Sequence, residues 1–169
     1  MKLTLNKVLS ILGGLIGFAA LFLFLAAPLQ TPAAEIFGQT IPAQPWDYNV
    51  VFFGNDTLNG AIGAFIGFIL MGVGGLIGVA SAFGKKSNKI LVLISIIITI
   101  VGAVLVFLTK TLWLGANDTG VSIPGIDLSK GVELAVGTII GGIMGIASAI
   151  IMLVSLIIPN KKASKKRRK

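Results

Sequence analysis

The stretch ILVLISIIITIVGAVLVFL, residues 90–108, decides the fold class of this chain. It contains no Asp, Glu, Lys or Arg, and its only polar side chains are Ser95 and Thr99. A helix needs about 20 apolar residues to cross roughly 30 Å of hydrocarbon. Three further runs meet this requirement, at about residues 8–27, 58–83 and 134–158. All four runs are continuous rather than alternating, which favours helices over the strands of a membrane barrel.

The composition excludes most classes of soluble protein. The 169 residues are 55% hydrophobic and only 12% charged, and the mean hydropathy is +0.98, whereas soluble domains carry about 25% charged residues. Because Cys and His are absent from the sequence, a disulfide framework, a zinc site, a thiol nucleophile and a Ser/His/Asp triad are excluded. We therefore expect an all-α integral membrane protein, a four-transmembrane-helix bundle with no enzymatic activity, no cofactor and no metal.

Charge placement predicts how the bundle is oriented. The segments before the first run, between the second and third, and after the fourth hold 12 of the 14 basic residues and no acid. All six acidic residues lie in the two remaining loops, 28–57 and 109–133. Because basic loops stay in the cytoplasm, both termini are predicted to be cytoplasmic and both of these loops to be outside. We expect a multi-pass protein of the cell membrane. The absence of Cys favours a bacterial cytoplasmic membrane over a eukaryotic cell surface.

The first run also has features of a cleaved signal peptide. Lys2 and Lys7 precede it, and residues 31–34 resemble a cleavage site. The run is, however, longer than the usual apolar region of about 7–15 residues. A spanning helix is therefore favoured; cleavage remains the alternative and leaves three spans.

Small residues recur at steps of four within the predicted spans. Ridges of this kind allow membrane helices to approach closely, either within one chain or between copies. The predicted packing positions are Gly13, Gly17, Gly63, Gly67, Gly74, Gly78, Gly137, Gly141, Gly145 and Ala149. A related phrase of Gly, two apolar residues, Gly, and then an apolar and two small residues starts at Gly14, Gly75 and Gly142. Each half of the chain reads as two helices joined by an acidic loop, and both loops contain a Trp followed by Asn-Asp-Thr, so a weak duplication of a two-helix unit is possible.

The first loop contains four prolines, followed by an apolar and aromatic segment at residues 46–54. That composition is typical of a strand closed by a turn, so a short β element is expected there. The aromatic residues of the loops either anchor the protein at the membrane interface or form a contact surface for a partner. They are Trp46, Tyr48, Phe52, Phe53 and Trp113.

Two tripeptides, at residues 55–57 and 117–119, share the sequence Asn-Asp-Thr and match the N-glycosylation pattern. Such short matches often arise by chance, and ordinary turns have the same composition.

The C-terminal segment 159–169 carries a dense block of positive charge, which is expected to be disordered. Its basic residues are expected to contact anionic lipid of the inner leaflet, whereas a nucleic-acid partner is disfavoured. They are Lys161, Lys162, Lys165, Lys166, Arg167, Arg168 and Lys169.

The layout resembles that of claudins and other four-span families, in topology alone, since their paired loop cysteines are missing here. A short multi-span chain with a polybasic end also resembles phage holins in outline. The favoured function is a structural or accessory one, exercised as an oligomer or as a subunit of a membrane complex and based on glycine-ridge packing. The alternative is an oligomeric pore or small-solute transport protein. An enzyme acting on lipid has the least support, because no general acid or base is expected at the inner face and none is paired outside.

Overall fold

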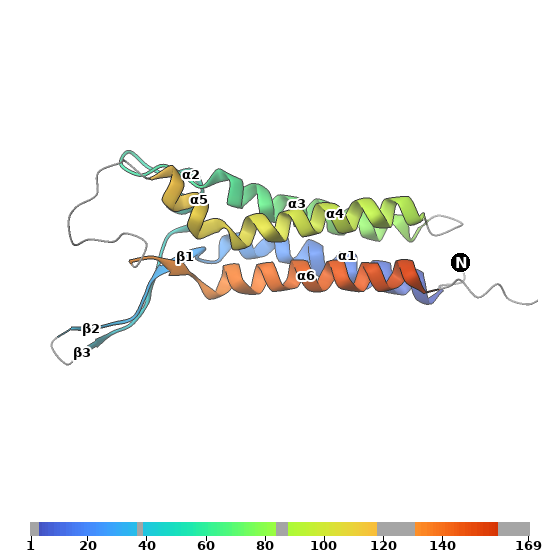
Figure 1. Cartoon of the computed structure of the whole chain (residues 1–169), viewed down its shortest axis with the longest axis horizontal. Coiled ribbons are helices and arrows are strands. Elements are labelled where there is room, and N and C mark those ends of the chain that lie inside the picture. Colours follow the sequence, from blue (N-terminus) through green and yellow to red (C-terminus); the bar gives the residue numbers. More distant parts are fainter. Residues whose placement is uncertain (1–3, 37–38, 84–87, 118–130, 159–169) are drawn as a thin grey trace, which may run out of the picture.

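The computed structural model describes residues 4–36, 39–83, 88–117 and 131–158, and it is mostly helical (Figure 1). Four helical segments are long and apolar enough to span a membrane. They are α1, Leu5–Leu21, continued by the short 3-10 helix η1, Phe22–Leu25; α3, Ile62–Ser81; α4, Lys89–Phe107; and α6, Val136–Ile157. The bounds differ from the predicted spans by four residues or fewer.

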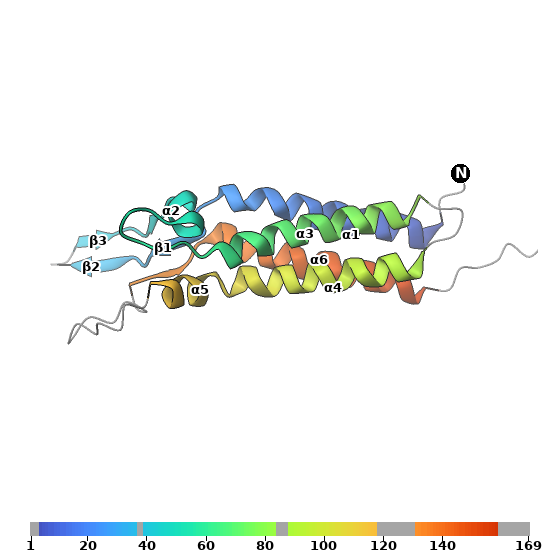
Figure 2. The same ribbon diagram turned by 90° about the horizontal axis from the view of Figure 1, so that it is seen from above.

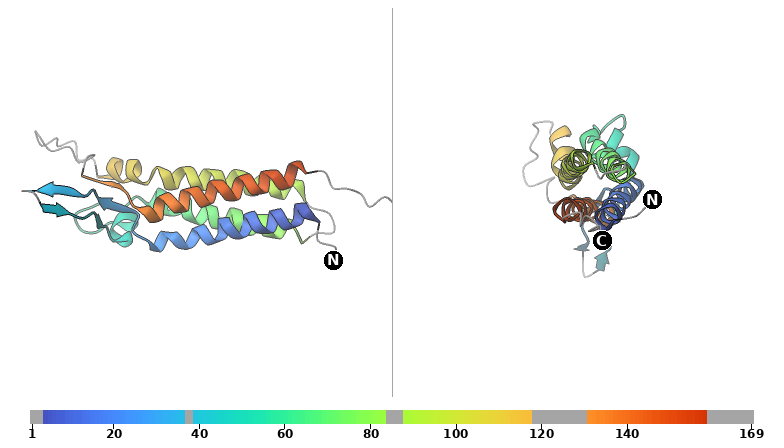
Figure 3. Two further views of the ribbon diagram at one scale, coloured as in Figure 1. Left: turned by 90° about the horizontal axis from the view of Figure 1, so that it is seen from below. Right: turned by 90° about the vertical axis from the view of Figure 1, so that its right-hand side faces the viewer.

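The four long helices form a closed ring in which each contacts two neighbours (Figures 2 and 3). Helix α1 packs between α3 and α6, and α4 packs between the same two helices on the opposite side. Successive helices run in opposite directions, so α1 begins and α6 ends at the same end of the bundle. This up-and-down arrangement is the usual one for helices joined by short loops.

The helices direct their bulky aliphatic side chains outward and their small and polar ones inward. Leu12 on α1, Val73 on α3, Ile97 on α4 and Ile143 on α6 are 42–55% exposed. Ser10, Ser95, Thr99 and Ser148, in contrast, are fully buried. A soluble bundle would bury the large apolar residues instead. This inverted pattern therefore fits a protein whose outer surface faces lipid.

The end of the bundle away from the termini carries the remaining elements, which we call the head. Strand β1, Leu29–Thr31, pairs antiparallel with β4, Gln44–Pro45, and with β5, Glu133–Leu134. Strands β2, Ala34–Ile36, and β3, Gln39–Ile41, pair with each other as a separate two-stranded hairpin. Two short helices complete the head: α2, Tyr48–Phe53, and α5, Thr109–Ala116.

The predicted strand at residues 46–54 is wrong, because the segment forms helix α2. Asp47 caps this helix: its Oδ1 atom accepts a hydrogen bond from Asn49 N at 2.8 Å. Gly54, with φ of 80°, ends it. A helix of this length turns Val51 and Phe52 together into the core, where both are 0% exposed. The local cap and this burial outweigh the strand propensity of a Val- and Phe-rich segment.

The predicted second outer loop also begins with helix rather than loop. Helix α5 follows α4 after a break at Leu108. The side chain of Thr109 is fully buried, and its hydroxyl donates to Val106 O at 2.6 Å. Because this segment contains polar residues such as Thr109 and Lys110, its hydropathy does not predict a helix. Segments 118–130 and 159–169 lie outside the described residues, and with them the whole predicted polybasic contact.

Candidate functional site

The closest helix contacts are reciprocal pairs of glycines. A Cβ atom added at Gly14 on α1 would lie 2.5 Å from the carbonyl oxygen of Gly75 on α3, and one added at Gly75 would clash with the Gly14 carbonyl. Gly67 on α3 and Gly102 on α4 form a second pair, in which the added Cβ atoms would lie 2.8 and 2.6 Å from the opposing carbonyl oxygens. Real Cβ atoms do not approach backbone this closely, so both crossings require glycine.

Most of the predicted packing glycines face neighbours in the same chain. The groups nearest to an added Cβ belong to Met152 for Gly13 and Gly78, to Ser148 for Gly17, to Phe68 for Gly141, and to Met71 for Gly145. Added Cβ atoms at Gly67, Gly74 and Gly137 meet Gly102, Thr99 and Ala26, and Ala149 is 3% exposed. Gly63 is the exception, because its nearest neighbour, Leu112 Cδ1, stands at an ordinary 3.4 Å. These ridges are therefore occupied within one bundle.

Sequence reasoning missed several of the tightest positions, namely Gly14, Gly75, Gly102 and Gly142. Three of them are the first residues of the recurring Gly phrase, which is the signal that marks them. Gly142 packs against the ring of Phe107, and a Cβ atom there would lie 2.5 Å from Phe107 Cε2. Steps of four identify a ridge, but the helix that covers it depends on the tertiary arrangement.

Buried hydroxyls join the helices at the glycine positions. Ser148 on α6 donates to Gly13 O on α1 at 2.6 Å, and Ser95 on α4 donates to Gly74 O on α3 at 2.5 Å. Because the acceptor residue has no side chain, the hydroxyl reaches the carbonyl directly. These bonds satisfy the polar groups inside a bundle where water is scarce. The hydroxyl of Thr99, on α4, has no partner in the described part of the chain, although it is fully buried.

At the end that holds the termini, α1 clamps the last turn of α6. The side-chain Nδ2 atom of Asn6 donates to Ser155 O at 2.9 Å and to Ile158 O at 2.6 Å. The hydroxyls of Ser10 and Ser155 lie 2.9 Å apart. Asn6 and the neighbouring Lys7 are 4% and 5% exposed. Asn6 therefore satisfies carbonyl groups that the end of a helix leaves open.

The centre of the bundle is filled by side chains. Phe68, Met71 and Met152 are all 0% exposed. Met152 Sδ lies 3.0 Å from the oxygen of the Ser95 hydroxyl, whose hydrogen is donated to Gly74 O. Met adapts its shape to irregular space, which suits a core otherwise built from glycine. The serines that a pore hypothesis would place along a passage are instead bonded between or along the helices.

The aromatic residues predicted to lie at the membrane interface fall into two groups. Phe52 and Trp113 are 0% and 5% exposed, so they belong to the core of the head. Trp46 packs edge-on against Trp113, with ring centroids 4.9 Å apart. Tyr48 is half-buried against Phe24. Of this set only Phe53 is exposed, at 53%, so the predicted anchoring at the membrane interface is compatible with its position.

Side chains from both loops hold the head together and fix it to the helices. Asn59, before α3, and Asn117, after α5, exchange hydrogen bonds: Asn117 Oδ1 accepts from Asn59 N at 2.7 Å, and Asn117 Nδ2 donates to Asn59 O at 2.8 Å. Gln30 on β1 donates to Glu133 on β5 at 2.6 Å. Thr138 on α6 donates to Pro28 O at 2.8 Å. The described parts of the two loops are thus joined to each other and to the end of the bundle.

Among the described elements of the head, strands β2 and β3 pack mainly against each other. The β2–β3 hairpin extends past the end of the bundle and to one side of the helix ring (Figures 1 and 3). Its residues Ala34, Glu35, Gln39, Thr40 and Ile41 are all exposed. A two-stranded ribbon is only marginally stable by itself. Its outer edges also carry backbone groups that no strand of the described chain pairs with.

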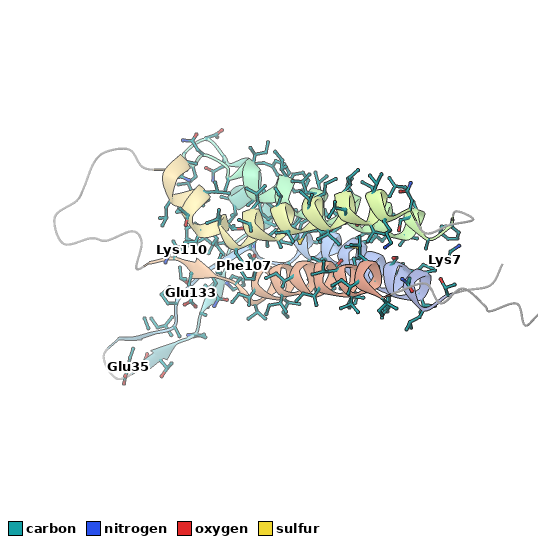
Figure 4. The ribbon with its side chains drawn as sticks, turned by 45° about the vertical axis from the view of Figure 1, so that its right-hand side comes forward. Lys7, Glu35, Phe107, Lys110 and Glu133 are labelled. Carbon is teal, nitrogen blue, oxygen red and sulfur yellow. The ribbon has the colours of Figure 1, made fainter. Side chains whose placement is uncertain are left out.

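Charge follows the long axis of the bundle. Figure 4 places Lys7 at one end, and Glu35, Lys110 and Glu133 at the other. Within the residues that the structure describes, no three acidic side chains gather as metal ligands, and Glu133 bonds to Gln30. Asp118 and Asp127, which the sequence places in the same loop, lie outside those residues.

Comparison with known proteins gives no relative: no family model matches the chain, and no curated protein is significantly similar to it.

Proposed function

We propose that this chain is a non-enzymatic accessory subunit of a membrane complex, which presents its head to a partner protein while its four helices hold it in the bilayer. The observation that carries the proposal is the contrast between the two parts. The helices pack most of their predicted glycine positions against neighbours in the same chain, and the buried hydroxyls of Ser148 and Ser95 bond to carbonyl groups of the adjacent helices. The head, in contrast, extends an exposed hairpin beyond the helices.

The placement of the glycines favours a partner at the head over self-association through helix ridges. A glycine ridge that joined two copies would have to lie on the outer surface of the ring. The outer surface here consists of large aliphatic side chains, such as Ile97 and Ile143. Lipid tails are as apolar as these residues, so this surface gives little drive for association.

The two loops that contain the head are rich in acidic residues, and the expected orientation places them outside the cytoplasm. Loops 28–57 and 109–133 together hold six acidic and two basic residues. Two such heads repel each other, which favours a different protein over a second copy. We expect the partner to present basic groups on the same side of the membrane. The cell membrane, and within it a bacterial cytoplasmic one, is the proposed location, with the polybasic segment against anionic lipid.

The pore alternative has less support. A passage through one protomer would have to displace Phe68, Met71 and Met152 from the centre of the bundle. A passage between protomers would be lined by the aliphatic outer faces, and ions and polar solutes cross such a surface poorly. Flux measurements on liposomes with and without the protein test this alternative directly.

Site-specific photo-crosslinking in cells tests the proposal. A photoreactive residue at Glu35 on the hairpin is expected to capture a defined second protein, and one at Ile97 on the lipid face of α4 is not. Purification in mild detergent should recover the same protein. The proposal is wrong if the Glu35 probe captures nothing and the chain purifies as a monomer. Capture only of a second copy of this chain would also contradict it, in favour of a homo-oligomer.

A further inference from the structure

The Asn-Asp-Thr sequence occurs twice, and the structure gives the two asparagines different surroundings. We infer that Asn55, and not Asn117, is the residue of this chain that can accept an N-linked glycan. The inference rests on the proposed orientation, in which both loops lie outside the cytoplasm. It selects one of two identical tripeptides, which the sequence pattern cannot do.

Asn55 lies in the turn between α2 and α3 with its side chain exposed. Its Oδ1 atom accepts hydrogen bonds from Thr57 N at 2.9 Å, Thr57 Oγ1 at 3.0 Å and Leu58 N at 2.8 Å. Within the described residues, its Nδ2 atom donates to nothing. The oxygen is therefore held in place, while the nitrogen that would carry the sugar is open to a transferase.

Asn117 has both atoms of its amide engaged. Its Nδ2 atom donates to Asn59 O at 2.8 Å and to Trp113 O at 2.9 Å, which uses both of its hydrogens. Its Oδ1 atom accepts from Asn59 N at 2.7 Å. A sugar on this nitrogen would remove one donor and place a bulky group between α5 and the turn before α3. The head would have to open first.

The reaction is a glycosyl transfer from a lipid-linked sugar phosphate or diphosphate. A bond forms between Asn55 Nδ2 and carbon C1 of the sugar, and the bond from C1 to the phosphate oxygen breaks. The phosphate leaves with the electron pair, and Nδ2 loses one proton to a base of the transferase. The chain contributes the acceptor nitrogen and the Thr57 hydroxyl, which holds the amide oxygen.

Translation of the full chain into microsomes that contain an oligosaccharyltransferase tests the inference. A single mobility shift, removed by a glycosidase, is expected for the wild type. The shift should disappear in Asn55→Gln. The shift should persist in Thr119→Ala, which destroys the second tripeptide but keeps Asn117 and its hydrogen bonds to Asn59 and Trp113. As a control for orientation, Gln39→Asn combined with Ile41→Thr introduces an acceptor tripeptide on the exposed hairpin.

The outcomes separate the inference from the proposed orientation. Loss of the shift in Thr119→Ala, or its persistence in Asn55→Gln, would overturn the choice of Asn55. An unmodified wild type beside a modified hairpin variant would overturn the inference but leave the head outside. If neither chain is modified, both the inference and the orientation on which it rests fail.

Discussion

A single methyl group is enough to disturb the contact between α1 and α3. In Gly14→Ala the new Cβ atom would lie 2.5 Å from the Gly75 carbonyl oxygen, and backbone cannot turn aside as a flexible side chain does. We expect a loss of about 1–3 kcal/mol in the free energy of unfolding, typical of overpacking. Thermal unfolding in detergent measures it.

Gly63→Ala is the matched control, because its new Cβ would meet only Leu112 at 3.4 Å. This variant should be neutral or stabilised by up to about 1 kcal/mol, as for glycine to alanine in a helix. Equal loss in both variants would contradict the prediction, because the close α1–α3 contact would then not be what makes Gly14→Ala costly.

Buried serines allow a second comparison between single residues. Ser148 donates across the bundle to Gly13 O, whereas Ser81 donates to Gly78 O within its own helix. Ser148→Ala is expected to cost about 0.6 kcal/mol, the average for hydrogen bonds between membrane helices. Ser81→Ala should change stability less, because its hydroxyl joins no second helix. Chemical unfolding in detergent tests the difference, and a larger loss in Ser81→Ala would contradict it.

Residue patterns predicted the small-residue positions but not their partners. A step of four places Gly137, Gly141 and Gly145 on one face from helix geometry alone. The helix that covers this face depends on the order of the ring. Gly14 and Gly75, one residue outside the predicted steps, form the closer contact. A periodicity argument cannot rank such neighbours, because it contains no distances.

Among the elements, the long helices were predictable and the head was not. In lipid only helices and closed barrels satisfy the backbone, and continuous runs of about 20 apolar residues favour the helix. In the head, water and side chains compete for the same groups, so Asp47 can convert a segment with strand composition into α2. The long-range pairing of β1 with β5 joins residues about 100 positions apart, and no local pattern indicates it.

The reciprocal hydrogen bonds between Asn59 and Asn117 are expected to couple the stability of the α2–α3 turn to that of α5. Asn117→Ala removes two hydrogen bonds to Asn59 and one to Trp113 O. At about 0.5–1.5 kcal/mol net for each of the two bonds to Asn59, the local opening of residues 54–61 should become easier by roughly 1–3 kcal/mol. Hydrogen exchange at these amides should then accelerate by about fivefold to 150-fold.

Asn55→Ala provides the comparison for this prediction, because the Oδ1 bonds of Asn55 all stay within its own turn. Exchange should accelerate there without any change in α5. If α5 remains fully protected in Asn117→Ala as well, the two loops do not depend on each other for their stability.

For the whole molecule, the predicted orientation places the two ends of the bundle on opposite sides of the membrane, with the head outside and the lysine-rich end in the cytoplasm. The structure places Lys7 at one end and Glu35 and Glu133 at the other. The chain contains no cysteine, so single cysteines can report orientation without a background signal. A membrane-impermeant maleimide should label Gln39→Cys in intact cells, because this hairpin residue is exposed. Lys162→Cys should react only after permeabilisation, since the positive-inside rule predicts that the basic segment lies in the cytoplasm. Labelling of Lys162→Cys in intact cells would place the lysine-rich end outside and reverse the direction in which the head can meet a partner.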